Sequence, residues 1–157
     1  MLYTLKEEYG DKDPVPFSHL TKNFNPKNEP CHTIRTNGQC HNEIKKNLHL
    51  SPMYSGEIEA VGPRYCPSIE DKVERFSKQP SHLLFLEPEW KNSDQIYING
   101  FSTSLPEEVQ IKSLSLIPGF EKIKFLRPGY AIEYDCFFPS QLKATLETKD
   151  VSGLFFA

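Results

Sequence analysis

The most informative stretch of the chain is GPRYCPSIEDKVERF, which occupies residues 62–76. Ser68 stands where a helix N-cap is expected, because a serine hydroxyl can accept a backbone N–H of the first helical turn. Asp71 then falls in that turn, where the positive end of the helix dipole favours a carboxylate. These signals predict a helix with one buried stripe, made by Ile69, Val73 and Phe76.

Cys66 lies two residues before this predicted cap, and Arg64 is close in sequence. A helix N-terminus and a guanidinium both favour the thiolate, so the sequence predicts a lowered pKa and a reactive sulfur. Pro63 and Pro67 would keep the loop stiff. The alternative is that Cys66 is a small buried apolar residue, as most free cysteines are.

The chain on either side of this stretch shows alternating short helix and strand signals. Asn37 is expected to cap a helix with Cys40, Ile44 and Leu48 on one face. Ser104 and Pro106 are expected to start another, which should stop at Pro118-Gly119. Short strands are predicted at 32–36, 83–87, 95–98, 123–125, 130–134 and 142–148, with an irregular arm at 10–30 and a loop at 51–67. The predicted fold class is mixed α/β (α+β), with short helices on a small mixed sheet.

Residues 153–157, GLFFA, form an apolar run after a glycine. This pattern predicts a strand that is buried on both faces. Because such a strand normally leads to a covering helix, we expect the chain to be truncated at this point.

Composition limits the possible functions. The chain has 157 residues, a 38% hydrophobic fraction and a formal net charge of −3, which predicts one soluble domain without a general affinity for nucleic acid. The N-terminus lacks the pattern of a signal or transit peptide, so we expect a cytoplasmic protein with four reduced cysteines. No glycine-rich phosphate loop is present.

Two weaker patterns each leave an alternative open. Cys31-His32 and Cys40-His41 could hold zinc, although their spacing is more typical of ordinary packing and surface residues. Residues 100–106 could offer an anion site at a helix start, although a plain helix cap is more common.

Charged clusters are also less informative. The carboxylate pairs Glu87/Glu89 and Glu133/Asp135 are more typical of solvated strand faces than of a glycosidase-like pair. Local basic clusters are more typical of a solvated surface than of RNA binding; they are Lys45-Lys46 and the set Arg64, Lys72, Arg75 and Lys78.

Several separate motifs resemble the MnmG/GidA family of tRNA uridine carboxymethylaminomethyl modification enzymes over nearly the whole chain. They are Ser51–Tyr54, Gly62–Lys72, Leu86–Glu89, Ser102–Pro106, Arg127–Asp135, Leu146–Lys149 and Gly153–Ala157. The resemblance implies that residues 1–129 form the inserted α/β nucleotide and substrate domain of a flavoprotein with two dinucleotide-binding-type domains. Residues 130–157 would then return into an incomplete FAD-binding domain and end in its truncated core strand.

The same resemblance implies an FAD- and NADH-dependent enzyme that modifies the wobble uridine of tRNA. Methylenetetrahydrofolate would supply the one-carbon unit, the GTPase MnmE would be the partner, and the full-length enzyme would be a homodimer. Cys66 would be catalytic, through acid/base or covalent handling of the uracil ring. The implied NAD-binding residues are Gly62, Pro63, Arg64, Tyr65, Cys66, Pro67, Ser68, Ile69, Glu70, Asp71, Lys72, Val73, Glu74, Arg75 and Phe76.

The chain also departs from the family pattern. His49-Leu50, Trp90, Cys136 and Phe138 replace the usual residues, and the glycine-rich FAD loop and a second implicated cysteine are absent. We therefore expect that the isolated chain is inactive and does not bind FAD stably. The competing hypothesis is a non-catalytic domain that binds a nucleotide or a partner.

Overall fold

The computed structural model describes residues 5–56, 67–132 and 137–156. Its elements alternate between short strands and short helices, as a mixed α/β chain requires. In order they are β1 (Lys6–Glu8), β2 (Cys31–Arg35), α1 (Gly38–Lys46), η2 (Leu48–Leu50), α2 (Pro52–Ser55), α3 (Ile69–Arg75), β3 (Leu83–Pro88), β4 (Ile96–Asn99), α4 (Glu107–Ser115) and η3 (Pro139–Gln141).

The strands form a four-stranded sheet in the order β1-β2-β3-β4, and every pairing is antiparallel. The expected mixed sheet is therefore wrong for the residues that the structure describes. The register places His32 opposite Leu86 and Leu86 opposite Ile98. Because side chains alternate along a strand, this register brings the buried Leu84 and Leu86 onto one face.

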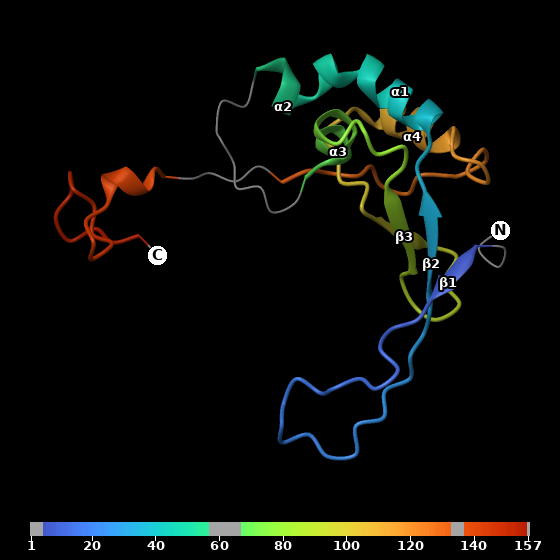
Figure 1. Cartoon of the computed structure of the whole chain (residues 1–157), viewed down its shortest axis with the longest axis horizontal. Helices are drawn as coiled ribbons and strands as arrows, with labels where there is room; N and C mark the ends of the chain where they lie inside the picture. Colours follow the sequence, from blue (N-terminus) through green and yellow to red (C-terminus); the bar gives the residue numbers. More distant parts are fainter. Residues whose placement is uncertain (1–4, 57–66, 133–136, 157) are drawn as a thin grey trace.

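Helices α1, α3 and α4 gather beside one end of this sheet, and the arm that follows β1 projects from the other end (Figure 1). The core forms where the helices meet the sheet. Its fully buried members include Ile44, Ile69, Val73, Leu84 and Ile117. No helix within the described ranges is long and apolar enough to cross a membrane.

Two predicted helix starts are confirmed in atomic detail. The Asn37 side chain accepts the N–H of Cys40 at 2.8 Å, which caps α1. Ser68 accepts the N–H of Asp71 at 3.2 Å, which caps α3. These short-range signals succeed because a cap needs only its own side chain and the next helical turn.

Other local predictions are wrong. The short helix α2 forms at Pro52–Ser55 where a loop was expected, and α1 ends at Lys46, so the expected helix position Leu48 falls in η2. Strand β1 had no sequence signal strong enough to predict it. Helix α4 begins after Pro106 without a side-chain cap and ends at Ser115, before the expected Pro118-Gly119. Ser104 does not cap α4, because its N–H and hydroxyl both bind the Glu70 carboxylate, at 2.9 and 3.0 Å.

The strands expected at 123–125 and 130–134 do not form in their described parts, which run to residue 132. The alternation of Ile123 and Phe125 instead reflects side chains that line a groove. Pro128 cannot donate to a strand ladder, and the Gly129 peptide is bound by a side chain instead.

The segment 137–156 differs most from expectation. Residues 142–148 form a turn closed by a bridge between Leu142 and Thr148, not an extended strand. Phe155 makes a single bridge to Glu147 and is 59% exposed, so the strand predicted to be buried on both faces is wrong in the described part of the chain. A buried strand needs neighbours on both edges, and Phe155 has one such contact.

Candidate functional site

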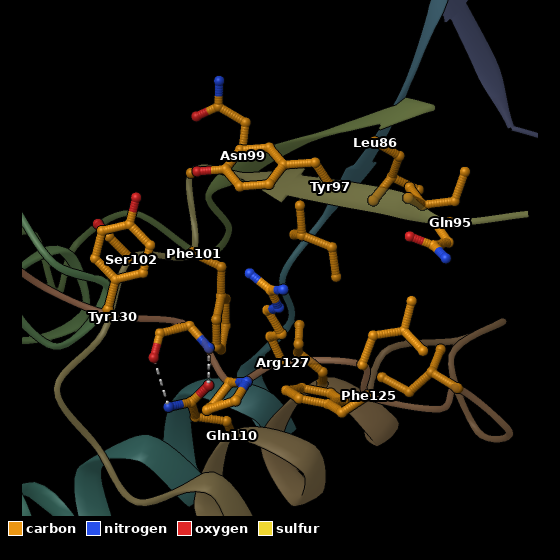
Figure 2. A pocket seen from close by; sticks show the side chains of 18 of the residues that line it. Leu86, Gln95, Tyr97, Asn99, Phe101, Ser102, Gln110, Phe125, Arg127 and Tyr130 are labelled. Carbon is orange, nitrogen blue, oxygen red and sulfur yellow. Dashed lines mark hydrogen bonds between the residues drawn. The ribbon is translucent and has the colours of Figure 1, made fainter. Parts of the chain in front are cut away.

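A groove of about 1300 Å³ lies between strand β4, helix α4 and the segment 120–132, which we call the strap (Figure 2). The position of the groove follows from the fold. The strap returns from α4 across the same face of the sheet that carries Leu86 and Ile98, and leaves space beneath it. It is larger than the hollow of about 670 Å³ that lies in the arm after β1.

The groove combines apolar walls with aromatic rings at an exposed rim. Leu86, Phe101 and Phe120 are buried and contribute to the wall. Tyr130 also lines it and is 66% exposed, so its ring is available to a ligand, whereas Tyr97 precedes Ile98 on β4 and turns its ring to the opposite face of the strand. Such a mixture suits a ligand with a flat ring and a polar end.

Gln110 on α4 holds the strap by a pair of hydrogen bonds to one peptide group. Its Oε1 accepts the Gly129 N–H at 2.7 Å, and its Nε2 donates to the Gly129 carbonyl at 3.2 Å. The same Nε2 donates to the Leu105 carbonyl at 2.7 Å. A Cβ on residue 129 would lie 3.2 Å from Gln110 Oε1, so glycine allows this close approach. This clasp was not predicted from the sequence.

Both signs of charge line the groove. Lys72 from α3 donates to the Gly100 carbonyl at 2.8 Å. Lys124 and Arg127 come from the strap, and Glu89 and Asp94 come from the connection between β3 and β4. The positive charge of the strap therefore faces a wall that is otherwise mainly apolar.

The stretch expected to bind NAD meets the groove through Pro67 and Lys72. The other described residues of that stretch do not line the groove. Ile69 and Val73 lie in the core, whereas Glu74 and Arg75 are exposed. Phe76 is 53% exposed, so its place in the predicted buried stripe is wrong, because α3 ends one residue earlier.

Gly62, Pro63, Arg64, Tyr65 and Cys66 lie outside the described residues, so the predicted thiolate stays a prediction. The chain on both sides of this gap is hydrogen-bonded to Ser104. Ser51 lies before the gap, and Glu70, whose carboxylate binds Ser104, lies after it. Ser51 and Ser104 share a 2.7 Å hydrogen bond between their hydroxyls.

Helices α2 and α3 are also joined directly across the gap. The Tyr54 hydroxyl donates to Asp71 Oδ1 at 3.2 Å, and burial together with the Asp71 charge raises the pKa of Tyr54 to about 12. Arg75 pairs with the same Asp71 oxygen at 3.2 Å. Tyr54 therefore stays a hydrogen-bond donor at neutral pH and keeps the two helices together.

Glu70 belongs to α3, and its side chain is fully buried. Its Oε1 accepts two hydrogen bonds from Ser104, whereas its Oε2 has no hydrogen-bond partner among the described residues. The contact between Glu70 and Ser104 could not be predicted from the sequence, because the two residues are 34 positions apart.

The possible anion site at 100–106 is wrong, because the N–H groups that would form it are already bound. The N–H groups of Thr103, Ser104 and Leu105 donate to the Tyr130 carbonyl, the Glu70 carboxylate and the Thr103 hydroxyl. An external anion would have to displace these bonds.

The zinc alternative also gains no support. Within the described ranges, no group of three or more cysteine, histidine or acidic side chains is placed to hold a metal. Burial raises the pKa of Cys40 to about 12, so its sulfur stays protonated. His41 instead shares a 2.7 Å hydrogen bond with Thr36.

Comparison with known proteins covers nearly the whole chain. The family model "Glucose inhibited division protein A" matches residues 2–157. The chain is 54% identical over 151 residues to the "tRNA uridine 5-carboxymethylaminomethyl modification enzyme MnmG" of Karelsulcia muelleri, covering 96% of this chain and 25% of that protein. The enzyme of the same name from Bacillus licheniformis is 54% identical over 148 residues, covering 94% of this chain and 24% of that protein.

A solved structure shows the same relationship in space. The structure of Aquifex aeolicus GidA in its form I crystal superposes with a TM-score of 0.74 at 45% identity. The match covers 98% of this chain and 27% of that chain. The chain therefore spans about a quarter of the length of the relatives it matches.

Proposed function

Because this chain belongs to the MnmG/GidA family, whose members are named as tRNA uridine modification enzymes, we propose that it is the nucleotide-binding part of such an enzyme. The reaction would add a carboxymethylaminomethyl group at the wobble uridine, in the cytoplasm. The observation that carries this proposal is the family match over residues 2–157 together with a groove next to the expected NAD-binding stretch.

NADH is the ligand that we propose for the groove. The volume of the groove, about 1300 Å³, exceeds the roughly 300–1000 Å³ of common small-molecule pockets, which leaves room for a dinucleotide. Tyr130 offers a ring face for a base or a nicotinamide. Pro67 and Lys72 connect this groove to the stretch that the resemblance assigns to NAD. When bound, NADH would supply a hydride.

FAD is placed elsewhere on the family resemblance alone, because the glycine-rich loop that the family uses for FAD is absent from this sequence. We therefore assign the main FAD contacts to parts of the enzyme beyond this quarter. The roles of methylenetetrahydrofolate, tRNA, MnmE and a second enzyme copy rest on the family resemblance alone.

Cys66 is the residue that we propose as catalytic, on the resemblance and its place in the sequence. Its thiol would act near the uracil ring, and Arg64 with the start of α3 would favour the thiolate.

A chimaeric enzyme tests the proposal. Residues 2–157 of this chain would replace the matching quarter of the Bacillus licheniformis enzyme in cells that lack their own, and tRNA nucleosides would be measured by mass spectrometry. We expect the modified uridine to return. A stable chimaera that binds FAD but leaves the uridine unmodified would contradict the proposal.

Cysteine variants of the chimaera then test the role of Cys66. Cys66→Ser should abolish the modified nucleoside, whereas Cys31→Ser, in strand β2, should leave most of it. Modification that survives Cys66→Ser would instead assign this domain a non-catalytic binding role.

A further inference from the structure

We propose that Arg127 binds a phosphate of the nucleotide that occupies the groove, and that Gln110 is the positioning residue that fixes the segment carrying it. The inference rests on the proposed function for its ligand class. It adds the residue that recognises the phosphate and the device that holds this residue in place.

Arg127 is exposed, and its side chain points from the strap into the hollow, toward the strand that carries Tyr97 (Figure 2). Its guanidinium makes no hydrogen bond or ion pair with any residue in the described ranges. A guanidinium offers five N–H donors in a planar fork that matches two oxygens of a phosphate. Arg127 therefore has both the direction and the free donors that an anion would use.

The backbone next to Arg127 is fixed at two successive residues. Gln110 binds both the N–H and the carbonyl of Gly129, and the Tyr130 carbonyl accepts the N–H of Thr103 at 3.1 Å. Pro128 joins Arg127 to this anchored pair, and its ring restricts the backbone between them. Gln110 itself is buried and uses both ends of its amide, so the strap is held from the protein interior.

The surroundings of Arg127 favour a nucleotide over a simple anion. Tyr130 lines the same hollow and provides an exposed ring face for stacking (Figure 2). Glu89 and Asp94 line the groove beyond Gln95, where a second phosphate would be repelled and ribose hydroxyls could donate hydrogen bonds. The guanidinium of Arg127, the exposed ring of Tyr130 and the two carboxylates together match a nucleotide with its phosphate at the Arg127 end.

The first experiment titrates the full 157-residue chain with NADH, ADP, inorganic pyrophosphate and adenosine by calorimetry. Arg127→Gln should weaken NADH and ADP about tenfold, because a charge-assisted pair to phosphate is lost, and should leave adenosine unchanged. Lys122→Gln is the matched control, since this exposed cation belongs to the same strap but is not among the residues that line the groove. It should change each affinity by less than about threefold.

The second experiment tests Gln110 as a positioning residue. Gln110→Met keeps the side-chain length but loses the clasp, and should weaken ADP about as much as Arg127→Gln. In the Arg127→Gln background it should have no further effect on ADP, because both changes remove the same contact. Gly129→Ala, which crowds Gln110 Oε1, should act in the same direction and provides a second variant if Gln110→Met does not fold.

The outcomes separate this inference from the proposed function. Binding of ADP and pyrophosphate that depends on Arg127, without binding of NADH, would uphold the inference and remove NADH from the proposed function. NADH binding that does not depend on Arg127, or equal losses in the Arg127 and Lys122 variants, would overturn the inference alone. A chain that binds none of the phosphate compounds, or a Gln110 variant whose loss persists without Arg127, would also overturn it.

Discussion

The body of residues 31–132 and the segment 137–156 use similar sequence patterns with opposite results. In the body, apolar residues at strand and helix spacing reach the core, and Leu84 and Ile69 are fully buried. In the segment 137–156, Phe137, Phe138 and Phe155 are all more than half exposed. Figure 1 shows this segment lying apart from the sheet and its helices.

The difference shows that an apolar pattern gives burial only where other elements supply a second surface. The body has the helices α1, α3 and α4 and the strands β2, β3 and β4 to provide this second surface. The segment 137–156 is held mainly by local bonds, in which Glu147 accepts the N–H of Gly153 and pairs with Lys143. Stability changes should therefore be large in the body and small in the segment.

Truncation of a large apolar side chain should show the largest contrast. Leu84→Ala should lower the free energy of unfolding by about 2–5 kcal/mol, because it leaves a cavity in the core. Phe155→Ala, at a 59% exposed position, should lower it by less than about 1 kcal/mol. Urea denaturation of both variants measures this. Equal losses would mean that the segment is packed as tightly as the body.

Two glutamates give the next largest contrast, since each binds a backbone N–H. Glu70→Ala should cost about 2–3 kcal/mol, because it leaves a cavity at a fully buried side chain and leaves the part-buried Ser104 N–H without its acceptor. Glu147→Ala should cost less than about 1 kcal/mol, because water can replace its bonds. Chemical denaturation with Glu108→Ala, on the exposed face of α4, is the control. A smaller loss for Glu70 than for Glu147 would contradict the account.

As the pH is lowered, the stability of the body should fall before that of the segment 137–156 does. Burial, followed by the charge of its neighbour His82 and then of Lys45, lowers the pKa of His41 below its usual 6.5. Burial and then the Lys72 charge lower the pKa of His82 below its usual value. As pH falls through 6.5, the unfolded chain takes up protons before the folded chain does, so stability present above pH 6.5 is lost below it.

Urea midpoints measured between pH 5 and pH 8 test this prediction. His82→Gln should flatten the profile, whereas His19→Gln, in the exposed arm, should not. In the segment 137–156, the Gly153 N–H and then Lys143 lower the pKa of Glu147 below its usual 4.5, so its share of stability is lost only at more acidic pH. A profile that His82→Gln does not flatten would contradict the assignment.

The smallest effect should come from the ion pair between Lys143 and Glu147, which are 2.9 Å apart at the surface. Lys143→Ala should change the free energy of unfolding by less than about 0.5 kcal/mol. Thermal unfolding in low and high salt checks this. A loss above 1 kcal/mol would show that the segment unfolds together with the body.

The sequence predicted the features that depend on near neighbours. The caps by Asn37 and Ser68 and the strand β3 were all expected, because each signal lies within a few residues. The clasp between Gln110 and Gly129 was not predicted, since it joins residues 19 positions apart by hydrogen bonds that no periodicity encodes.

The candidate site was predictable in the same uneven way. The stretch at 62–76 indicated the correct neighbourhood, and Pro67 and Lys72 do line the groove. Most of the groove comes instead from β4 and the strap, where the alternation of Ile123 and Phe125 was mistaken for a strand. Alternating apolar residues predict a face, but they do not determine whether a sheet or a cavity lies against it.

Hydrogen–deuterium exchange of the full chain, with and without saturating NADH, tests the central claim most directly. The account predicts slower exchange at residues 96–102 and 123–132, on the two sides of the groove, and no change at residues 137–156. Slower exchange confined to residues 137–156, or no change anywhere in the chain, would contradict it.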